Sequence, residues 1–466
     1  MRIQPARQLR GRVSNLPGDK SISHRAAIIS ALAFGQSRIA NFSTSQDCIS
    51  TLRCLDQLGV TIKWKGRDLL VQGVGSESRE NPLPWLRAST QALDCGNSGS
   101  TMRMLAGVLA GQPFSSILTG DDSLQSRPMT RIIEPLERMG ARLLSEQGRA
   151  PLRIEGRNPL ASIRYEMPIA SAQVKSAILL AGLCADGRTE VIEKLGPTRD
   201  HTERMLRWFG VDVVTKTGGR SIPGDDVGES RNGIEGGGTP SPSVVVQGPA
   251  QLRARDVIVP GDISSAAFLL AAASLLPGSH LEIAGVGLNA TRAHIVETLV
   301  ALGADIRAVN IREQCHEVIG DIEVRGTDML ASSVGGSEPH ILRGPIIAGL
   351  IDELPILAVV GTQVKGGLRI GDAKELRVKE SDRIRTTVEN LRAMGADVEE
   401  YEDGLAVDGP VRLRGARLRA YGDHRIAMAC AVAALIAEGE SEIEGAECVG
   451  VSFPEFFQLL DSVTKR

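Results

Sequence analysis

The sequence predicts an α/β protein built from six related modules, each with one buried helix, one outer helix and a few strands. Three observations predict it: amphipathic segments that end at a glycine, alternating strand patterns that follow these glycines, and alanine-rich stretches that are apolar nearly all round. The chain has 466 residues, 42% of them hydrophobic, which is enough for two or three domains with sizeable cores.

The amphipathic segments have the pattern of helices closed by a C-terminal glycine. They end at Gly59, Gly140, Gly210, Gly303 and Gly395. Glycine is the usual residue after a helix, because it adopts the left-handed conformation without strain. The glycines are roughly 70 to 93 residues apart, a spacing longer than that of solenoid repeats, which favours separate helix-plus-sheet modules.

Alternating strands follow each of these glycines. A first strand and a turn lead to a second strand, predicted at Leu69–Gly73, Leu152–Gly156, Val244–Gly248, Ile322–Gly326 and Leu405–Gly409. A period of two is typical of a sheet with one buried face.

The alanine-rich stretches predict buried helices, since a helix that is apolar all round has no face for water. They begin at Ser21, Asn97, Ser171, Asp262, Asp352 and Asp423. These polar residues suit the start of a helix. At Asp352 a carboxylate fits either an N-cap or a general base, and the residue pattern alone favours the cap.

Residues 217–243 differ from the rest of the chain, because glycine, serine and proline dominate them. We expect a flexible surface insertion within the third module. Val259-Pro-Gly-Asp262 has the character of a hinge before the fourth module.

The composition excludes several classes of function. A net charge of −3 and only 3% aromatic residues disfavour a nucleic-acid-binding protein. Seven scattered cysteines without a CxxC pair favour a reducing, cytoplasmic compartment. The sequence contains neither a signal-peptide core nor an apolar run of about 18 residues, so no membrane span is expected. The seven histidines lack paired ligand spacing, so no metal site is expected.

The segment Leu16–Arg25 predicts an anion-binding site. Pro17 and Gly18 break the backbone, and Lys20, Ser21, Ser23 and Arg25 follow in the first turns of an apolar helix. A helix N-terminus has unpaired N–H groups and partial positive charge, which favour a phosphate or carboxylate. A capped helix with solvated charges is the alternative, but cations in a first turn oppose the helix dipole and favour a ligand.

Other cations also lie near the starts of predicted elements. They are Arg127, Lys175, Arg199, Lys379, Arg383 and Arg425. If these starts converge, a protein with net negative charge would have a strongly cationic cleft, suited to one or two small, highly charged anions. Asp352 and Glu380 would add groups for proton transfer there.

Six motifs, in order along nearly the whole chain, carry a family resemblance. They are GDKSISHR at 18–25, GNSGSTMR at 96–103, DDSLQSRPM at 121–129, SAQVKSA at 171–177, RVKESDR at 377–383 and GDHRIAM at 422–428. With these motifs the chain closely resembles the 5-enolpyruvylshikimate-3-phosphate synthase (3-phosphoshikimate 1-carboxyvinyltransferase) family. The segments at 171–173 and 259–267 are similar to its class II branch.

The resemblance implies an inside-out α/β barrel of two domains, each with three βαβαββ modules. One domain would be discontinuous and contain residues 1–18 and 260–466, and the other would contain residues 19–259. The implied reaction is addition of the 5-hydroxyl of shikimate 3-phosphate to C2 of phosphoenolpyruvate. A tetrahedral intermediate then loses phosphate. The resemblance implies no metal, no cofactor and a cytoplasmic monomer whose partners are these two small anions.

The resemblance also implies roles for individual residues. Shikimate 3-phosphate would contact Lys20, Ser21, Arg25, Ser171, Gln173, Arg199, Asp352 and Lys379. Phosphoenolpyruvate would contact Lys20, Gly99, Arg127, Gln173, Arg383 and Arg425. Asp352 would be the base near the 5-hydroxyl, which reverses the preference for a cap, and Glu380, with Lys20, would handle the methylene proton.

The chain departs from the family pattern at two positions. Val451 stands where some relatives have a lysine, which leaves open the group that protonates the departing phosphate. Ala172 removes one hydroxyl from the implied phosphate site. Glyphosate-tolerant class II relatives often have alanine at the position of Gly99, so we hypothesise that this protein binds glyphosate.

Three other functions are alternatives. UDP-N-acetylglucosamine enolpyruvyl transferases share the implied fold, but they have asparagine where this chain has Ser21 and usually cysteine where it has Asp122. An RNA-end-binding protein of related architecture would be expected to have more basic and aromatic residues. A non-catalytic binding protein would need the cations but neither Asp352 nor Glu380.

Overall fold

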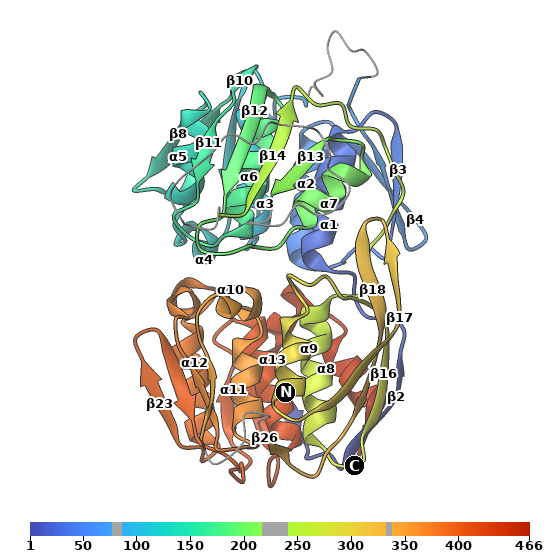
Figure 1. The fold of residues 1–466 in the computed structure, drawn as a ribbon, viewed down its shortest axis with the longest axis vertical. Coiled ribbons are helices and arrows are strands. Elements are labelled where there is room, and N and C mark those ends of the chain that lie inside the picture. The colour runs from blue at the N-terminus through green and yellow to red at the C-terminus, as the bar shows by residue number, and fades with distance from the viewer. Residues whose placement is uncertain (77–85, 217–240, 332–337) are drawn as a thin grey trace, which may run out of the picture. The chain divides into compact units, whose positions relative to one another are not determined.

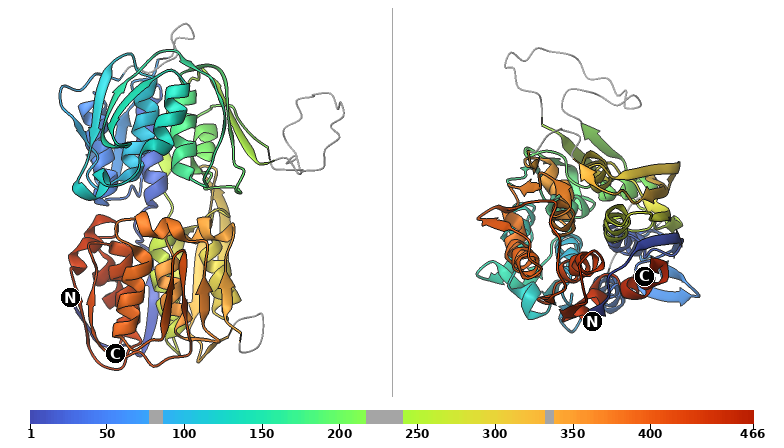
Figure 2. Two further views of the ribbon diagram at one scale, coloured as in Figure 1. Left: turned by 90° about the vertical axis from the view of Figure 1, so that its left-hand side faces the viewer. Right: turned by 90° about the horizontal axis from the view of Figure 1, so that it is seen from below.

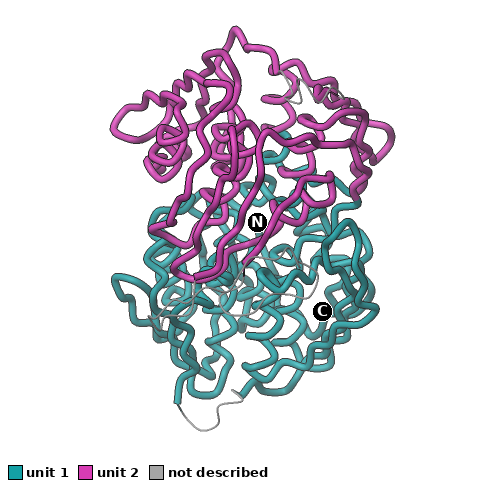
Figure 3. The backbone as a smooth tube through the Cα atoms, turned by 45° about the horizontal axis from the view of Figure 1, so that its top comes forward, with its two compact units in different colours: residues 1–23, 41–49, 258–466 teal, residues 24–40, 50–257 magenta. Residues whose placement is uncertain are grey.

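The computed structural model describes residues 1–76, 86–216, 241–331 and 338–466. The chain divides into two compact units, which Figure 3 colours separately. Unit 1 contains residues 1–23, 41–49 and 258–466, and unit 2 contains residues 24–40 and 50–257. Unit 1 therefore includes both termini, and helix α1 (Lys20–Leu32) begins in unit 1 and continues into unit 2.

The first three modules (Figure 1) form unit 2, except that residues 20–23 and 41–49 of the first module fall in unit 1. The first has α1, β3 (Gln36–Ala40), α2 (Gln46–Gln57), β4 (Thr61–Lys65) and β5 (Asp68–Gln72), and β15 (Val257–Ile258) joins its sheet. The second has β6 (Leu93–Asp94), α3 (Gly99–Ala110), β7 (Ser115–Thr119), α4 (Asp122–Gln125), α5 (Thr130–Arg138), β8 (Arg142–Glu146) and β9 (Arg149–Glu155). The third has β10 (Leu160–Ala161), β11 (Arg164–Glu166), α6 (Ala172–Gly182), β12 (Ala185–Ile192), α7 (His201–Trp208), β13 (Val213–Lys216) and β14 (Ser243–Gly248).

The other three modules form most of unit 1. The fourth has β2 (Gln8–Val13), α8 (Ile263–Leu275), β16 (His280–Gly287), α9 (His294–Ala301), β17 (Asp305–Gln314) and β18 (Glu317–Arg325). The fifth has β19 (Leu330–Ala331), β20 (His340–Leu342), α10 (Ile346–Leu350), α11 (Leu354–Gly361), β21 (Val364–Lys365), β22 (Leu368–Ile370), η1 (Lys374–Val378), α12 (Arg383–Ala393), β23 (Val398–Tyr401) and β24 (Gly404–Val407). The sixth has β25 (Arg417–Arg419), α13 (His424–Leu435), β26 (Ser441–Glu444), η2 (Ala446–Val451), α14 (Phe456–Val463), β27 (Thr464–Lys465) and β1 (Arg2–Ile3).

The modules share one strand order. In β6-β7-β9-β8 the first pair is parallel and the other two pairs are antiparallel, and the sheets β20-β22-β24-β23 and β2-β16-β18-β17 repeat this pattern. The N-terminal strand β2 takes the first position of the fourth module, where it lies parallel to β16 with Gly11 opposite Leu281. Strand β1 likewise lies antiparallel to β26 in the sixth module.

The five glycines predicted to end the outer helices all have a positive φ. The angle is 88° at Gly59, 102° at Gly140, 88° at Gly210, 96° at Gly303 and 88° at Gly395. These are left-handed backbone conformations, which a side chain would strain. The predicted helix ends are therefore confirmed at all five positions.

The alanine-rich helices form the cores, and the sheets lie outside them (Figure 2). In α8 and α13 every residue from the first turn to the penultimate position is buried. The apolar core of unit 1 gathers α8, α11 and α13 with the inner faces of its strands. Helices α3 and α6 are buried in the same way in unit 2. The expected two-domain α/β fold with buried helices is confirmed.

Two predicted helix starts are corrected by the structure. Helix α11 begins at Leu354 after Glu353, and no side chain caps it, so Asp352 lies in the preceding turn and is not an N-cap. Helix α3 is capped by Ser98, whose Oγ accepts from Thr101 N, and not by Asn97. Of the predicted insertion 217–243, residues 217–240 lie outside the described residues, and Ser243 already begins β14.

Among the helices in the described part of the chain, none combines the length and apolar character that a membrane span needs.

Candidate active site

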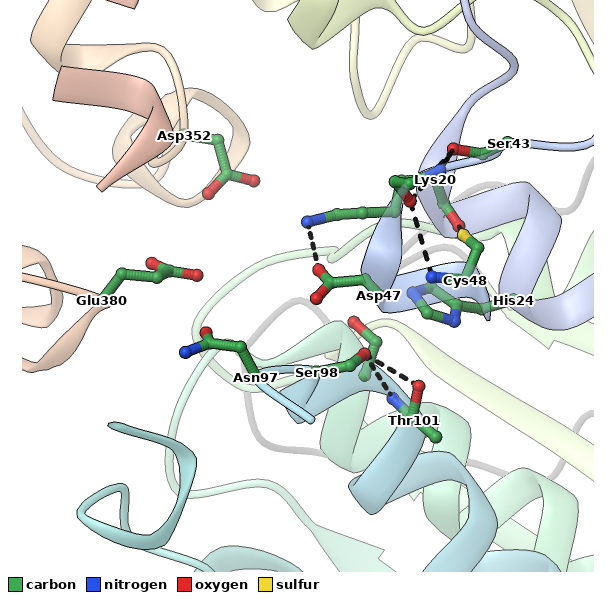
Figure 4. A network of polar contacts seen from close by, with 12 residues as sticks. Lys20, His24, Ser43, Asp47, Cys48, Asn97, Ser98, Thr101, Asp352 and Glu380 are labelled. Atoms are coloured by element: carbon green, nitrogen blue, oxygen red, sulfur yellow. Dashed lines mark hydrogen bonds and ion pairs between the residues drawn. The ribbon is translucent and has the colours of Figure 1, made fainter. Parts of the chain in front are cut away.

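The first turn of α1 places Lys20 beside a carboxylate of unit 1. Asp19 begins the helix by accepting from Ile22 N at 2.8 Å. Lys20 Nζ lies 2.8 Å from Asp47 Oδ2 (Figure 4). Burial lowers the pKa of Lys20, but Asp47 outweighs it, so the pKa is raised above its ordinary value. Lys20 is therefore a stable ammonium at neutral pH.

Arg383 is the centre of an acidic cluster in unit 1. Its guanidinium is buried, with Nε 2.8 Å from Asp423 Oδ2 and Nη2 2.7 Å from Glu380 Oε2. Nη1 lies 3.4 Å from Asp352 Oδ1. Burial lowers the pKa of Arg383, but Asp423 and Glu380 raise it more, so the cation is permanent. One arginine thus brings together the two carboxylates predicted to move protons.

Asp423 links this cluster to Arg425. Its Oδ1 accepts from the Arg425 backbone N at 2.9 Å and so caps α13. The buried Arg425 guanidinium lies 3.8 Å from Glu353 Oε1 and 6.0 Å from the centre of the Phe268 ring. Between them, burial and the nearby Lys20 lower the pKa of His424 to about 4, so its imidazole is neutral at pH 7.

Lys379 lies in the segment between η1 and α12 and is half-buried. Burial lowers the pKa of Lys379, although the Asp352 carboxylate opposes the shift. Lys379 therefore loses its proton at a lower pH than Lys20, which lies in the same unit.

In unit 2, Arg25 joins three helices of the first and third modules. It is 4% exposed, and it donates from Nε to Thr202 Oγ1 at 2.6 Å and from Nη2 to Ser176 Oγ at 2.7 Å. Ser176 and Thr202 are themselves 2.7 Å apart. A guanidinium is thereby fixed between α1, α6 and α7. Ser21 and Arg199, which share its predicted ligand, are half-buried at the starts of α1 and α7.

Gln173 connects the starts of α6 and α3. Its Oε1 accepts from Arg103 Nη1, and its Nε2 donates to Ser100 Oγ at 2.9 Å. Ser171 caps α6 by accepting from Val174 N. The predicted residues Ser171 and Gln173 therefore occur together at one helix start.

Arg127 lies against the same α3 start. It is 9% exposed, and Nη2 donates to Asn97 Oδ1 at 2.6 Å and to Ser123 Oγ at 3.2 Å. A side chain at Gly99 would meet Arg103 Nη1 at 2.6 Å and Arg127 Nη1 at 3.6 Å. The glycine therefore leaves room directly beside two guanidinium groups.

Lys175 does not belong to the candidate site, which corrects the sequence prediction. Its side chain is 1% exposed, and its Nζ lies 2.7 Å from Glu203 Oε1 and 3.2 Å from Glu193 Oε2. Burial lowers the pKa of Lys175, but the two glutamates raise it further. Its charge is neutralised inside the third module. The convergence of the remaining cations on one cleft stays a prediction.

Four residues that contact the predicted site residues were not themselves predicted from the sequence. Asp423 and Arg103 lie inside recognised motifs, and a search for the partners of motif arginines would have found them. Asp47 and Arg292, which contact Lys20 and Asp352, lie in no recognised motif, so only the tertiary structure identifies them. Over the described ranges, no three His, Cys, Asp or Glu side chains are grouped as metal ligands.

Comparisons with known proteins show the family of this chain. The family model described as EPSP synthase (3-phosphoshikimate 1-carboxyvinyltransferase) matches residues 3–460. A 3-phosphoshikimate 1-carboxyvinyltransferase from Koribacter versatilis is 47% identical over 467 residues, covering 100% of this chain and 99% of that protein. A 3-phosphoshikimate 1-carboxyvinyltransferase from Desulforamulus reducens is 46% identical, covering 99% of this chain and 98% of that protein. The solved EPSP synthase from Acinetobacter baumannii has a TM-score of 0.81 at 37% identity, covering 99% and 98% of the two chains. This chain therefore belongs to the EPSP synthase family.

Proposed function

We propose that this protein transfers the enolpyruvyl group of phosphoenolpyruvate to the 5-hydroxyl of shikimate 3-phosphate and releases phosphate. It is a 3-phosphoshikimate 1-carboxyvinyltransferase of the shikimate pathway, which leads to chorismate and the aromatic amino acids. The observation that carries the residue roles is the arrangement around Arg383, which holds Asp352 and Glu380 in the unit that also contains Lys20.

Shikimate 3-phosphate is bound by cations and hydroxyls that match its phosphate and carboxylate. The cations are Lys20, Arg25, Arg199 and Lys379, the hydroxyls are those of Ser21 and Ser171, and Gln173 and Asp352 add an amide and a carboxylate. Arginine suits planar anions, since its guanidinium donates two parallel hydrogen bonds. The fixed position of the Arg25 guanidinium supports its role, because Thr202 and Ser176 hold it in one place between α1, α6 and α7.

Phosphoenolpyruvate is bound by Lys20, Gly99, Arg127, Gln173, Arg383 and Arg425. The missing side chain at Gly99 supports a close approach beside Arg103 and Arg127. Arg383 and Arg425 share Asp423, which orients one guanidinium and caps the helix that carries the other. This shared carboxylate makes the two arginines a preorganised pair for an anion.

The chemistry consists of an addition and an elimination. Asp352 accepts the 5-hydroxyl proton as the oxygen bonds to C2, while Glu380, with Lys20, gives a proton to the methylene carbon and makes it a methyl group. In the second step the methyl group returns its proton to Glu380, the C2–O bond to phosphate breaks with its electron pair leaving on the phosphate, and the double bond re-forms. The proton that Asp352 accepted balances the one that the phosphate carries away. General acid–base groups typically contribute about 10²- to 10⁴-fold in rate.

Phosphate release is the direct test of this function. Purified protein is given phosphoenolpyruvate with shikimate 3-phosphate, and in parallel with UDP-N-acetylglucosamine. We expect release only with the first acceptor. Release with the UDP sugar alone would assign the chain to the other enolpyruvyl transferases, and release with neither acceptor would support a binding protein.

The protein acts as a monomer in the cytoplasm. Its seven cysteines, all of them described, are free thiols, which supports a reducing compartment. Light scattering coupled to size exclusion tests the monomer, since a dimer would double the expected mass of 49.6 kDa.

A further inference from the structure

Arg292 is a buried arginine that none of the proposed roles uses. It lies in the turn between β16 and α9 and is 3% exposed. Asn289 builds this turn, since its Oδ1 accepts from Thr291 N at 2.9 Å and its backbone O accepts from Arg292 N at 2.8 Å. The backbone that carries Arg292 is therefore firmly placed.

The Arg292 guanidinium has one well-paired side and one poorly paired side. Nη2 donates to Ser264 Oγ at 2.6 Å and lies 3.5 Å from Asp262 Oδ1 and 4.0 Å from Asp19 Oδ2. Nε and Nη1 are buried, and neither has a hydrogen-bond partner among the described residues. Buried donors without a hydrogen-bond partner are unfavourable. A purely structural ion pair would not require this arrangement.

The poorly paired side faces Asp352. Nη1 of Arg292 lies 4.0 Å from Asp352 Oδ2, and Nη1 of Arg383 lies 3.4 Å from the other oxygen, Oδ1. Hydrogen bonds of catalytic groups are often long before substrate binds and shorten in the complex. The carboxylate thus has one guanidinium at each oxygen, from two different elements.

We propose that Arg292 is a positioning residue for Asp352, fixing one carboxylate oxygen while Arg383 fixes the other. The proposal rests on the proposed role of Asp352 as the base. When these contacts shorten in the substrate complex, both oxygens are held and the carboxylate plane is set for the substrate hydroxyl, while the neighbouring positive charge keeps the carboxylate ionised.

The other charges around Asp352 set the direction of the expected effect. They are Arg383 from α12, Lys379 and Glu380 from the segment before α12, the adjacent Glu353, and the carboxylates behind the two arginines, Asp19, Asp262 and Asp423. Without the charge of Arg292, the remaining carboxylates favour the protonated form of Asp352. Activity that needs the ionised form is then lost at a higher pH.

The test compares Arg292→Gln, which removes the charge but retains an amide donor for Ser264, with Arg292→Lys, which retains the charge. The readout is the pH profile of kcat/KM, with kcat and both KM values. For the glutamine variant we expect the acid limb to move up by about one pH unit and kcat to fall at least about tenfold. For the lysine variant we expect the acid limb to stay within about 0.3 pH units of its wild-type position, and kcat again to be lower than in the wild type.

Arg312 of β17, which is exposed, supplies the control. Arg312→Gln should change neither the acid limb of the pH profile nor kcat. An unmoved acid limb with wild-type kcat in the glutamine variant would overturn the proposal. If that variant does not fold, as judged by circular dichroism, the lysine variant decides. A wild-type kcat then overturns the proposal, and a lowered kcat with an unmoved limb supports it.

Asp352→Asn separates this inference from the proposed function. If the acid limb persists in Asp352→Asn, the base assignment itself is wrong. If the limb disappears in Asp352→Asn but is unmoved in Arg292→Gln, Asp352 remains the base and only the positioning role of Arg292 fails.

Discussion

The buried carboxylate of Asp423 accepts from Arg383 Nε at 2.8 Å and from the Arg425 backbone N at 2.9 Å. One side chain thus orients the Arg383 guanidinium and caps the helix that begins with Arg425, and both arginines are predicted to bind phosphoenolpyruvate. Burial raises the pKa of Asp423, but Arg383 outweighs it and holds the pKa below the ordinary value. The contribution of this carboxylate to stability is therefore present above its unfolded pKa and is lost as the pH falls through the folded value.

Asp423→Asn is expected to weaken phosphoenolpyruvate binding and the fold together. Removing one partner of a buried ion pair costs about 3 kcal/mol or more when the remaining charge is left uncompensated. Because Glu380 and Asp352 still face Arg383, we expect a smaller loss here. We expect a higher KM for phosphoenolpyruvate and a lower free energy of unfolding in urea. Asp461→Asn, which breaks the exposed pair with Arg466, serves as the control and should change neither. A wild-type KM for Asp423→Asn would contradict the orienting role.

Asp47→Asn is expected to shift the alkaline limb of the activity profile. Asp47 raises the pKa of Lys20 above 10.5, so the stability from this pair is present below that pH and is lost as the pH rises through the folded value. Without Asp47, burial and Arg425 lower the pKa of Lys20, and of the groups that raise it Glu380 remains. The alkaline limb of kcat/KM should therefore move to lower pH, whereas Asp68→Asn, at the Arg38 pair, should leave it in place. An unmoved limb in Asp47→Asn would exclude Lys20 as the titrating group.

Asp352→Ala is expected to lower kcat by about 10²- to 10⁴-fold, because the 5-hydroxyl loses its proton acceptor. The affinity for shikimate 3-phosphate, measured by titration calorimetry, should stay close to that of wild type, since the cations that bind the phosphate are unchanged. An unchanged turnover would rule out the base assignment.

Gly99→Ala is expected to weaken inhibition by glyphosate, a phosphoenolpyruvate competitor. The added methyl group would meet Arg103 Nη1 at 2.6 Å, and the flexible end of that side chain can move, so the variant should fold. We expect the inhibition constant to rise by at least about tenfold, roughly the effect of 1.4 kcal/mol. Gly450→Ala, where a methyl group meets no atom within 4 Å, is the control. If glyphosate inhibited the wild type no more tightly than it inhibits Gly99→Ala, the hypothesis of glyphosate binding would be refuted.

Thr51→Val is expected to destabilise unit 2 through a buried chain of hydrogen bonds. Thr51 Oγ1 lies 2.7 Å from His24 Nδ1 and 2.6 Å from Thr101 Oγ1. Thr101 Oγ1 donates to Ser98 Oγ at 2.8 Å (Figure 4). Valine has the same shape without the hydroxyl, so its buried partners lose about 1–3 kcal/mol. Urea unfolding of Thr51→Val and Thr51→Ser measures this. Equal stability of the two variants would show that the hydroxyl contributes nothing.

The repeats were predictable because local physics determines them. A left-handed glycine ends each predicted outer helix, and alanine-rich stretches are buried wherever they occur, so both features are readable over a few residues. The helix start predicted at Asp352 was wrong, since α11 begins two residues later. No side chain caps this helix, so the polar residue before it did not mark where it starts. Lys175 was misassigned because its partners Glu193 and Glu203 lie in later segments of the module.

The sequence by itself determined the module pattern, the family and the residue types of the candidate site. Only the tertiary structure decided which side chains each of the cations meets. Lys175 and Arg25 have similar sequence contexts at helix starts, yet one meets two glutamates and the other meets two hydroxyls. The reason is that electrostatic pairing depends on distances of a few ångströms between side chains, and residues that are far apart in the sequence supply those partners.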